Sequence, residues 1–173
     1  CPPDISLITG ICGQHLETFG TFQNVVKAKG EILGYTKDRA VIADDCFDLF
    51  AENPVPKIRC GCVSDIHCSP DGVGFTLTLN GESRRAHSKL LGKHSAYNIG
   101  LAAEAAFVAG MSLDEIVSAI GNLEFIEHRL QLIKANGVNI LDDGYNSNVK
   151  GARAALEVLK TFGGRKIVVT PGL

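Results

Sequence analysis

The chain lacks an excess of charge of either sign. Its 173 residues include 17 lysines and arginines against 19 aspartates and glutamates, which gives a formal net charge of −2. Nucleic acids and anionic membrane surfaces are bound through clustered positive charge. The composition gives no basis for either role, and we expect no nucleic-acid partner.

Long hydrophobic runs, a signal peptide, repeats and low-complexity segments are also missing. No apolar stretch approaches the roughly 20 residues that a membrane-spanning helix needs, and no leader-like segment opens the chain. Hydrophobic residues make up 45% and charged residues 21%, an ordinary globular balance. We therefore expect a protein without a membrane span, with one sizeable core or a domain plus part of another.

The six cysteines do not form the pattern of a disulfide scaffold. They lie at positions 1, 12, 46, 60, 62 and 68, within segments that resemble ordinary core. Such a distribution is typical of a reducing compartment, so a cytoplasmic location is expected. The chain opens on Cys1 and stops at Pro171-Gly172-Leu173, directly after an apolar segment. Both ends look cut, and we expect a fragment of a longer protein.

Short apolar runs alternate with helical patterns along the chain. Buried strands are predicted by runs of apolar residues at 5–9, 39–43, 57–62 and 166–170. Helices are predicted by spacing and capping residues at 22–34, 45–52, 95–110, 112–121 and 149–161. Ser95 is the expected cap of the third helix, and the last helix has an apolar face made of Val149, Ala152, Leu156 and Leu159.

Two Asn-Gly pairs predict tight turns. Asn80-Gly81 lies between alternating segments and predicts a hairpin over 74–90 with one wet face, and Asn136-Gly137 predicts two short strands over 130–142. The later order strand, helix, strand predicts the start of a parallel α/β unit. A domain boundary is expected near residues 124–129.

Lys29 has an unusual position in the predicted helix 22–34. It lies three or four residues from Val25, Val26, Ile32 and Leu33, which places it in the apolar stripe. Burial favours the neutral amine of a lysine, which is a nucleophile and can take up carbon dioxide as a carbamate. The alternative is a buried stem whose ammonium group reaches water.

Two other sequence motifs give weaker evidence of function than Lys29 does. Gly92-Lys93 is not a phosphate-binding P-loop, because the preceding glycine spacing is absent and His94 follows in place of serine or threonine. Cys60, Cys62, His67 and Cys68 could hold zinc, but their spacing matches no common zinc pattern.

Three motifs occur in a characteristic order. They are TGICGQHLETFGTFQNVVKAKGE at 9–31, GKHSAYN at 92–98, and Arg129 followed by LDDGYNSN at 141–148. Together they resemble the Mur ligase family of ATP-dependent amide-bond ligases of peptidoglycan synthesis. The KAKGE and DDGYNSN forms are most similar to the branch that adds D-alanyl-D-alanine to UDP-MurNAc-tripeptide.

The resemblance implies a fold and a domain division. The expected class is α/β: part of a mostly parallel P-loop-type sheet with helices and a small antiparallel hairpin, followed by the start of a Rossmann-like α/β domain. Residues 1–125 would be the C-terminal portion of the central ATPase domain, and residues 126–173 the truncated beginning of the C-terminal domain. The glycine-rich phosphate loop of the family would lie upstream, so this piece alone is expected neither to hydrolyse ATP nor to ligate.

The resemblance also implies a site for ATP and Mg²⁺. His15 and a carbamylated Lys29 would be the catalytic metal ligands, since a carbamate supplies the hard oxygen that magnesium prefers. Asn98 would contact adenine, Arg129 would face the phosphates, and Asp143 would lie near the ribose. Asp142 and Asn146 stand beside Asp143 in the same motif.

Each nucleotide-site residue has a structural alternative. Asn98 could satisfy backbone donors in a first helical turn, Arg129 could be a surface charge, and DDGYN could be a turn after a strand. Three departures from the family pattern, Ser95, Gly144 and Val149, remove no charged group.

The implied enzyme is a monomeric carbon–nitrogen ligase whose small-molecule substrates are UDP-MurNAc-tripeptide and D-Ala-D-Ala. Two alternatives differ in substrate or in class. A folylpolyglutamate or cyanophycin synthetase would keep ATP and magnesium, whereas a non-catalytic Mur-like domain would only scaffold partners.

Overall fold

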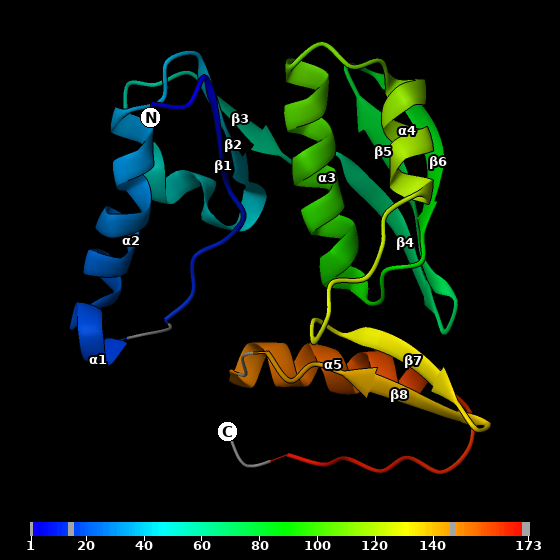
Figure 1. The fold of residues 1–173 in the computed structure, drawn as a ribbon. Coiled ribbons are helices and arrows are strands. Elements are labelled where there is room, and N and C mark those ends of the chain that lie inside the picture. Colours follow the sequence, from blue (N-terminus) through cyan, green and yellow to red (C-terminus); the bar gives the residue numbers. More distant parts are fainter. Residues whose placement is uncertain (1, 14–15, 146–147, 171–173) are drawn as a thin grey trace. The chain divides into compact units, whose positions relative to one another are not determined.

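The structure, a computed structural model, describes residues 2–13, 16–145 and 148–170. The chain divides into two compact units, the first made of residues 1–62 and 98–113 and the second of residues 63–97 and 114–173 (Figure 1). These units are compact bodies in the structure, whereas the expected domains 1–125 and 126–173 follow from the family resemblance. The expected domain division therefore stays a prediction. Within the described residues, no helix combines the length and apolarity that crossing a membrane requires.

The first unit contains a parallel sheet of three strands. β1 (Ile5–Ile8), β2 (Arg39–Ala43) and β3 (Lys57–Cys60) pair in that order. The central strand carries Ala40, Val41 and Ile42, which are fully buried. A parallel strand covered on both faces is expected to be apolar without alternation, and this confirms the strand predictions over 5–9 and 39–43.

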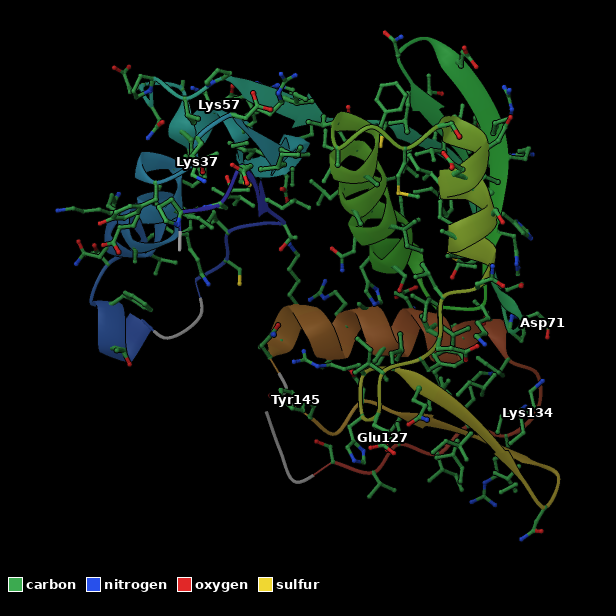
Figure 2. The ribbon with its side chains drawn as sticks, turned by 45° about the horizontal axis from the view of Figure 1, so that its top comes forward. Lys37, Lys57, Asp71, Glu127, Lys134 and Tyr145 are labelled. Atoms are coloured by element: carbon green, nitrogen blue, oxygen red, sulfur yellow. The ribbon has the colours of Figure 1, made fainter. Side chains whose placement is uncertain are left out.

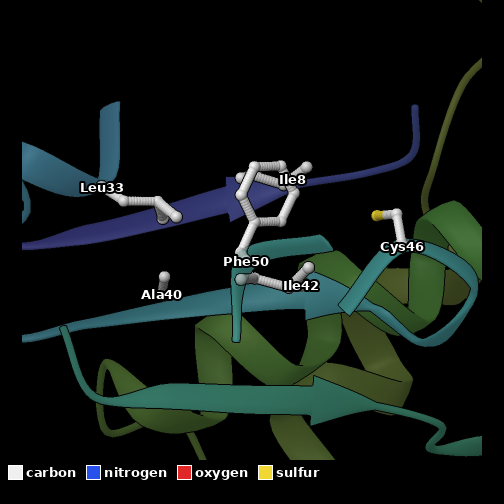
Figure 3. Close-up of a cluster of buried hydrophobic side chains, with 6 residues drawn as sticks. All are labelled: Ile8, Leu33, Ala40, Ile42, Cys46 and Phe50. Atoms are coloured by element: carbon white, nitrogen blue, oxygen red, sulfur yellow. The ribbon is translucent and has the colours of Figure 1, made fainter. Parts of the chain in front are cut away.

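One face of this sheet packs a hydrophobic cluster (Figure 3). Ile8 of β1 is aligned with Ile42 of β2, and Phe50 lies against them from η2 (Asp44–Phe50), a 3₁₀ helix. The cluster is completed by Leu33, Ala40 and Cys46. The predicted helix at 45–52 therefore forms, but with the tighter 3₁₀ winding that is common in short connectors.

The helix predicted over 22–34 is shorter in the structure. After α1 (Leu16–Phe19), α2 (Phe22–Gly30) is capped by Thr21, whose side chain accepts a hydrogen bond from the Asn24 backbone N–H over 3.2 Å. The chain then winds into η1 (Glu31–Gly34), a 3₁₀ turn. Ile32 and Leu33 therefore do not continue the α-helical spacing of Val25 and Val26.

The second unit contains an antiparallel sheet of β4 (Val63–Ser69), β5 (Gly72–Leu79) and β6 (Glu82–Ser88). Alternate residues of β5 are buried, namely Val73, Phe75, Leu77 and Leu79. Asn80 and Gly81 turn the chain with φ of 48° and 81°, which confirms the predicted hairpin and its wet face. The sequence does not predict β4, because its residues alternate less clearly between apolar and polar side chains.

Two helices follow, α3 (Lys93–Val108) and α4 (Leu113–Gly121). The prediction that Ser95 caps α3 is wrong, because the helix begins two residues earlier. The Ser95 hydroxyl donates instead to the Leu91 carbonyl over 2.7 Å.

The last elements are a hairpin and a helix. β7 (Gln131–Ala135) and β8 (Val138–Asp142) pair around Asn136-Gly137 as predicted. α5 (Val149–Thr161) is capped by Asn148, whose side chain accepts from the Gly151 N–H over 2.8 Å. The buried side chains at α5 are Val158 and Phe162, which pack with Leu91 and Leu130.

Two predictions for this region are wrong. The apolar face expected on the last helix included Val149 and Leu156, which are 67% and 43% exposed. Residues 166–170 form no strand, and Val169 is 93% exposed. A buried parallel strand needs a neighbour for its backbone groups, and no strand pairs with this segment in the described part of the chain.

Candidate functional site

Two short segments of the second unit are joined by hydrogen bonds beside the β7–β8 hairpin. The first is 128–130, and the second is 142–145, which begins at the last residue of β8. The backbone N–H of Tyr145 donates to the His128 carbonyl over 3.1 Å, and that of Leu130 donates to Asp143 Oδ1 over 3.1 Å. We call these residues the Arg129 loop cluster, because Arg129 lies at its centre.

The cluster holds an unusual backbone. His128 and Leu130 have φ of 59° and 48°, a left-handed conformation that costs an L residue roughly 1–2 kcal/mol. The hydrogen bonds from Leu130 and Tyr145 offset this cost. Asp143 therefore has a structural role in fixing the backbone on either side of Arg129.

Arg129 is exposed and stacks on an aromatic ring. Its guanidinium carbon lies 4.0 Å from the centroid of the Tyr145 ring, and Tyr145 projects from the loop after β8 (Figure 2). Stacking orders the planar guanidinium while its N–H donors remain available to an anion. The cluster thus presents a fixed, solvent-accessible cation beside two aspartates.

The aspartates differ in their partners. Asp142 Oδ2 lies 2.7 Å from His128 Nδ1, and Asp142 Oδ1 accepts from the Gly144 N–H over 3.1 Å. The hydrogen bond to Asp142 raises the pKa of His128, and the same bond lowers the pKa of Asp142. The pair therefore favours an imidazolium beside a carboxylate.

This pair predicts a defined pH dependence. Its contribution to stability is present between the two pKa values, is lost as pH rises through the raised pKa of His128, and is lost as pH falls through the lowered pKa of Asp142. We expect a pH titration of the His128 ring protons by NMR to give a pKa above the ordinary histidine value. Asp142→Asn should return it toward that value, and an unchanged titration in this variant would contradict the pairing.

His94 is a further candidate site residue, because the charge of Asp143 acts on its imidazole. It follows Gly92, whose φ is +85°, and a Cβ added at Gly92 would lie 2.8 Å from both His94 Cε1 and Val158 Cγ2. Desolvation lowers the pKa of His94, partly opposed by the charge of Asp143. The lowered pKa favours the neutral imidazole, which can accept a hydrogen bond.

The structure places Lys29 in the first unit, at a shallow pocket by the carboxyl end of β1. The pocket is lined by Leu7, Ile8, Thr9, Gly10, Ala28, Lys29 and Ile32. Lys29 is exposed, so the prediction that it is buried in an apolar stripe is wrong. The cause is the end of α2 at Gly30, beyond which the residues counted into that stripe leave the α-helical spacing.

The remaining predicted site residues are Asn98, His15 and Asn146. Asn98 is exposed on α3, beyond its first turn. His15 and Asn146 lie outside the described residues. Thus Arg129, Asp142 and Asp143 are brought together, whereas the roles of all the predicted site residues stay predictions.

Some residues that matter to these sites were missed. His94, His128 and Tyr145 lie within the motifs or the expected domain boundary, but no role is predicted for them from the sequence. The predicted cysteine group joins Cys60 and Cys62 with His67 and Cys68, whereas the structure groups the two cysteines with Glu104. No sequence signal links Glu104 to the two cysteines, because Glu104 lies 42 positions after Cys62 and 44 positions after Cys60.

Comparisons with known proteins agree with the fold. A family model of the Mur ligase middle domain matches residues 1–106. The UDP-N-acetylmuramoyl-tripeptide–D-alanyl-D-alanine ligase of Escherichia coli (strain K12) is 30% identical over 182 residues, covering 96% of this chain and 40% of the relative.

Solved structures show the same similarity. A crystal structure of MurF from Acinetobacter baumannii is 25% identical, with a TM-score of 0.87, over 94% of this chain and 38% of that one. MurF ligase from Thermotoga maritima, solved in complex with ADP, is 22% identical, with a TM-score of 0.84, over 95% of this chain and 41% of that one. This second match supports the fold alone.

The chain thus spans about 40% of the length of the curated relative it matches. The family match extends over more than half of the chain, and the α/β architecture agrees with it. The chain belongs to the Mur ligase family.

Proposed function

We propose that this chain is part of an ATP-dependent ligase that joins D-alanyl-D-alanine to UDP-MurNAc-tripeptide. The observation that carries the proposal is the similarity to the E. coli ligase of that name, which extends over 96% of the chain. The same proposal includes a cytoplasmic, monomeric enzyme with small-molecule substrates. It assigns activity to the longer protein, with this chain contributing part of the site.

The reaction would proceed through an acyl phosphate. A carboxylate oxygen of the tripeptide attacks the γ-phosphorus of ATP, and ADP leaves with the electrons of the broken P–O bond. The amine of D-alanyl-D-alanine then attacks the acyl carbon, loses a proton and expels inorganic phosphate. Positioning and charge neutralisation supply most of the catalysis in such phosphoryl transfers.

The Arg129 loop cluster would meet the nucleotide. The stacked guanidinium of Arg129 suits phosphate oxygens, because its N–H donors form a rigid fork. Asp143 would accept from a ribose hydroxyl through its second oxygen while Oδ1 holds the Leu130 N–H. Asn98, exposed on α3, would pair with adenine through its amide.

The pocket at Lys29 would serve the metal. It lies at the carboxyl end of a parallel strand, where α/β folds bind ligands. Carbamylation would replace an ammonium by carboxylate-like oxygens, which fit Mg²⁺, with His15 as a second ligand. Because Lys29 is exposed, retention of the carbamate would depend on the bound metal rather than on burial. The metal would neutralise charge on the transferred phosphoryl group.

A substrate panel on the longer protein tests the proposal. Phosphate release that requires ATP, UDP-MurNAc-tripeptide and D-alanyl-D-alanine together is the expected result. Release that instead requires a folate and glutamate would overturn the assigned substrate, and no ATP-dependent turnover with any acceptor would support a scaffold.

A substitution of Arg129 tests its proposed contact with the nucleotide phosphates. Arg129→Ala in the longer protein should lower kcat/KM by about 10²-fold, the scale of losing one preorganised charge contact in a transition state. Arg153→Ala, an exposed arginine on α5, is the control and should leave kcat/KM unchanged. Equal effects in the two variants would argue against a role for Arg129 at the nucleotide. Thermal unfolding of both variants checks that each remains folded.

A further inference from the structure

Three metal-ligating side chains of the first unit gather where β3 ends. Cys60 is the last residue of β3, Cys62 follows two residues later, and Glu104 is on α3. One ligand atom from each lies within 4.8 Å of the others, and the two Sγ atoms are 3.5 Å apart. The group is part of neither the Lys29 pocket nor the Arg129 loop cluster.

The sulfur spacing matches a tetrahedral metal. Two thiolates that each lie ~2.3 Å from a tetrahedral Zn²⁺ are ~3.8 Å apart, by the ordinary zinc–sulfur distance. The observed 3.5 Å is close to this value and well beyond the ~2.05 Å of a disulfide. The pair is therefore arranged to chelate one ion after only a small displacement.

The surroundings favour a cation. Glu104 is half-buried, and its carboxylate has no hydrogen-bond or ion-pair partner among the residues that the structure describes. The neighbouring cation Arg59 is already paired with Asp44 and Asp48. Cys62 is buried, and its Sγ lies 3.3 Å from the Gly100 carbonyl oxygen, which fixes it beside α3. A divalent ion would satisfy a carboxylate that the protein leaves without a partner.

We propose that Cys60, Cys62 and Glu104 form a binding site for a thiophilic divalent cation of the Zn²⁺ class. The three residues supply two sulfurs and one oxygen, and a water would complete the tetrahedron. Binding displaces the protons of the two thiols, and the ion joins the end of β3 to α3. Two thiolates suit a soft or borderline ion better than Mg²⁺, which prefers oxygen ligands. This site does not depend on the proposed ligase activity.

Titration with Cd²⁺ tests the site directly, using the purified 173-residue chain in a phosphine reductant. We expect one Cd²⁺ per chain and an ultraviolet thiolate-to-metal absorption band. Cys60→Ser and Cys62→Ser should abolish the band, and Glu104→Gln should weaken the affinity about tenfold or more. Cys68→Ser is the matched control, since Cys68 lies in β4 outside the group, and it should leave the band unchanged.

A second measurement needs no substitution. In the unaltered chain, Zn²⁺ should slow alkylation of Cys60 by iodoacetamide, followed site by site by peptide mass spectrometry, and should raise the thermal midpoint. The absence of a Cd²⁺ band and of Zn²⁺ protection in the unaltered chain would overturn the proposal. A band that persists in folded Cys60→Ser or Cys62→Ser, or an affinity unchanged in Glu104→Gln, would also overturn the three-residue site.

Discussion

Gly72→Ala is expected to lower the free energy of unfolding of the second unit by about 2–5 kcal/mol, combining left-handed backbone strain and overpacking. Gly72 begins β5 with φ of +136°, a conformation that L side chains rarely adopt. A Cβ built there would lie 2.1 Å from the Ser88 carbonyl oxygen and 2.8 Å from Lys89 Cα. Both obstacles are backbone atoms, so no side-chain rotation can relieve the clash.

Gly81→Ala separates the two contributions. Gly81 also has a positive φ, +81°, but a Cβ there would meet nothing within 4 Å. This variant should lose only about 1–2 kcal/mol, the backbone strain alone. Urea unfolding followed by circular dichroism gives both values. If the two variants lost the same stability, close packing at Gly72 would not be the cause.

The contrast shows what local sequence can predict. Asn80-Gly81 and Asn136-Gly137 predicted their hairpins, because the left-handed turn conformation belongs to those residue types. Asn148 is the capping residue at the start of α5 for a similar local reason. The close approach of Ser88 to Gly72 depends on the pairing of β5 with β6, and no local sequence pattern predicts it.

Predictions of burial were less accurate where burial depended on another element of the chain. Residues 166–170 have the composition of a buried strand, yet they are exposed because no strand pairs with them in the described chain. Burial of Lys29 was inferred from a helical stripe that ends at Gly30. In both cases the sequence has the apolar pattern. The pairing strand or the continued α-helix that would bury it is absent from the residues that the structure describes.

The candidate site was predictable as a set of residues but not as a geometry. Resemblance to the Mur ligases identified Arg129, Asp142 and Asp143, and the structure brings these three together. It could not indicate that His128 and Leu130 adopt left-handed conformations, because neither residue is a glycine. The ring of Tyr145 beneath Arg129 follows from those backbone turns and not from sequence spacing.

Lys29→Ala is expected to lower the ligase activity of the longer protein by about 10³-fold, if the carbamate helps position a metal that neutralises the transferred phosphoryl group. Lys29 is exposed and lines the pocket by Thr9 and Gly10, so truncation removes little packing. The thermal midpoint should therefore be nearly unchanged. Lys27→Ala is the matched control, since Lys27 is an exposed lysine of the same helix and does not line that pocket.

Rescue distinguishes the carbamate from a simple ammonium contact. The truncated side chain leaves an open route to solvent, so a short carboxylate such as acetate can supply the missing oxygens in Lys29→Ala. Rescue by acetate, but not by an alkylamine, with kcat recovering as acetate is raised, is the expected result. Rescue by the amine alone would mean that Lys29 acts as a cation. An active Lys29→Ala enzyme would remove Lys29 from the catalytic site altogether.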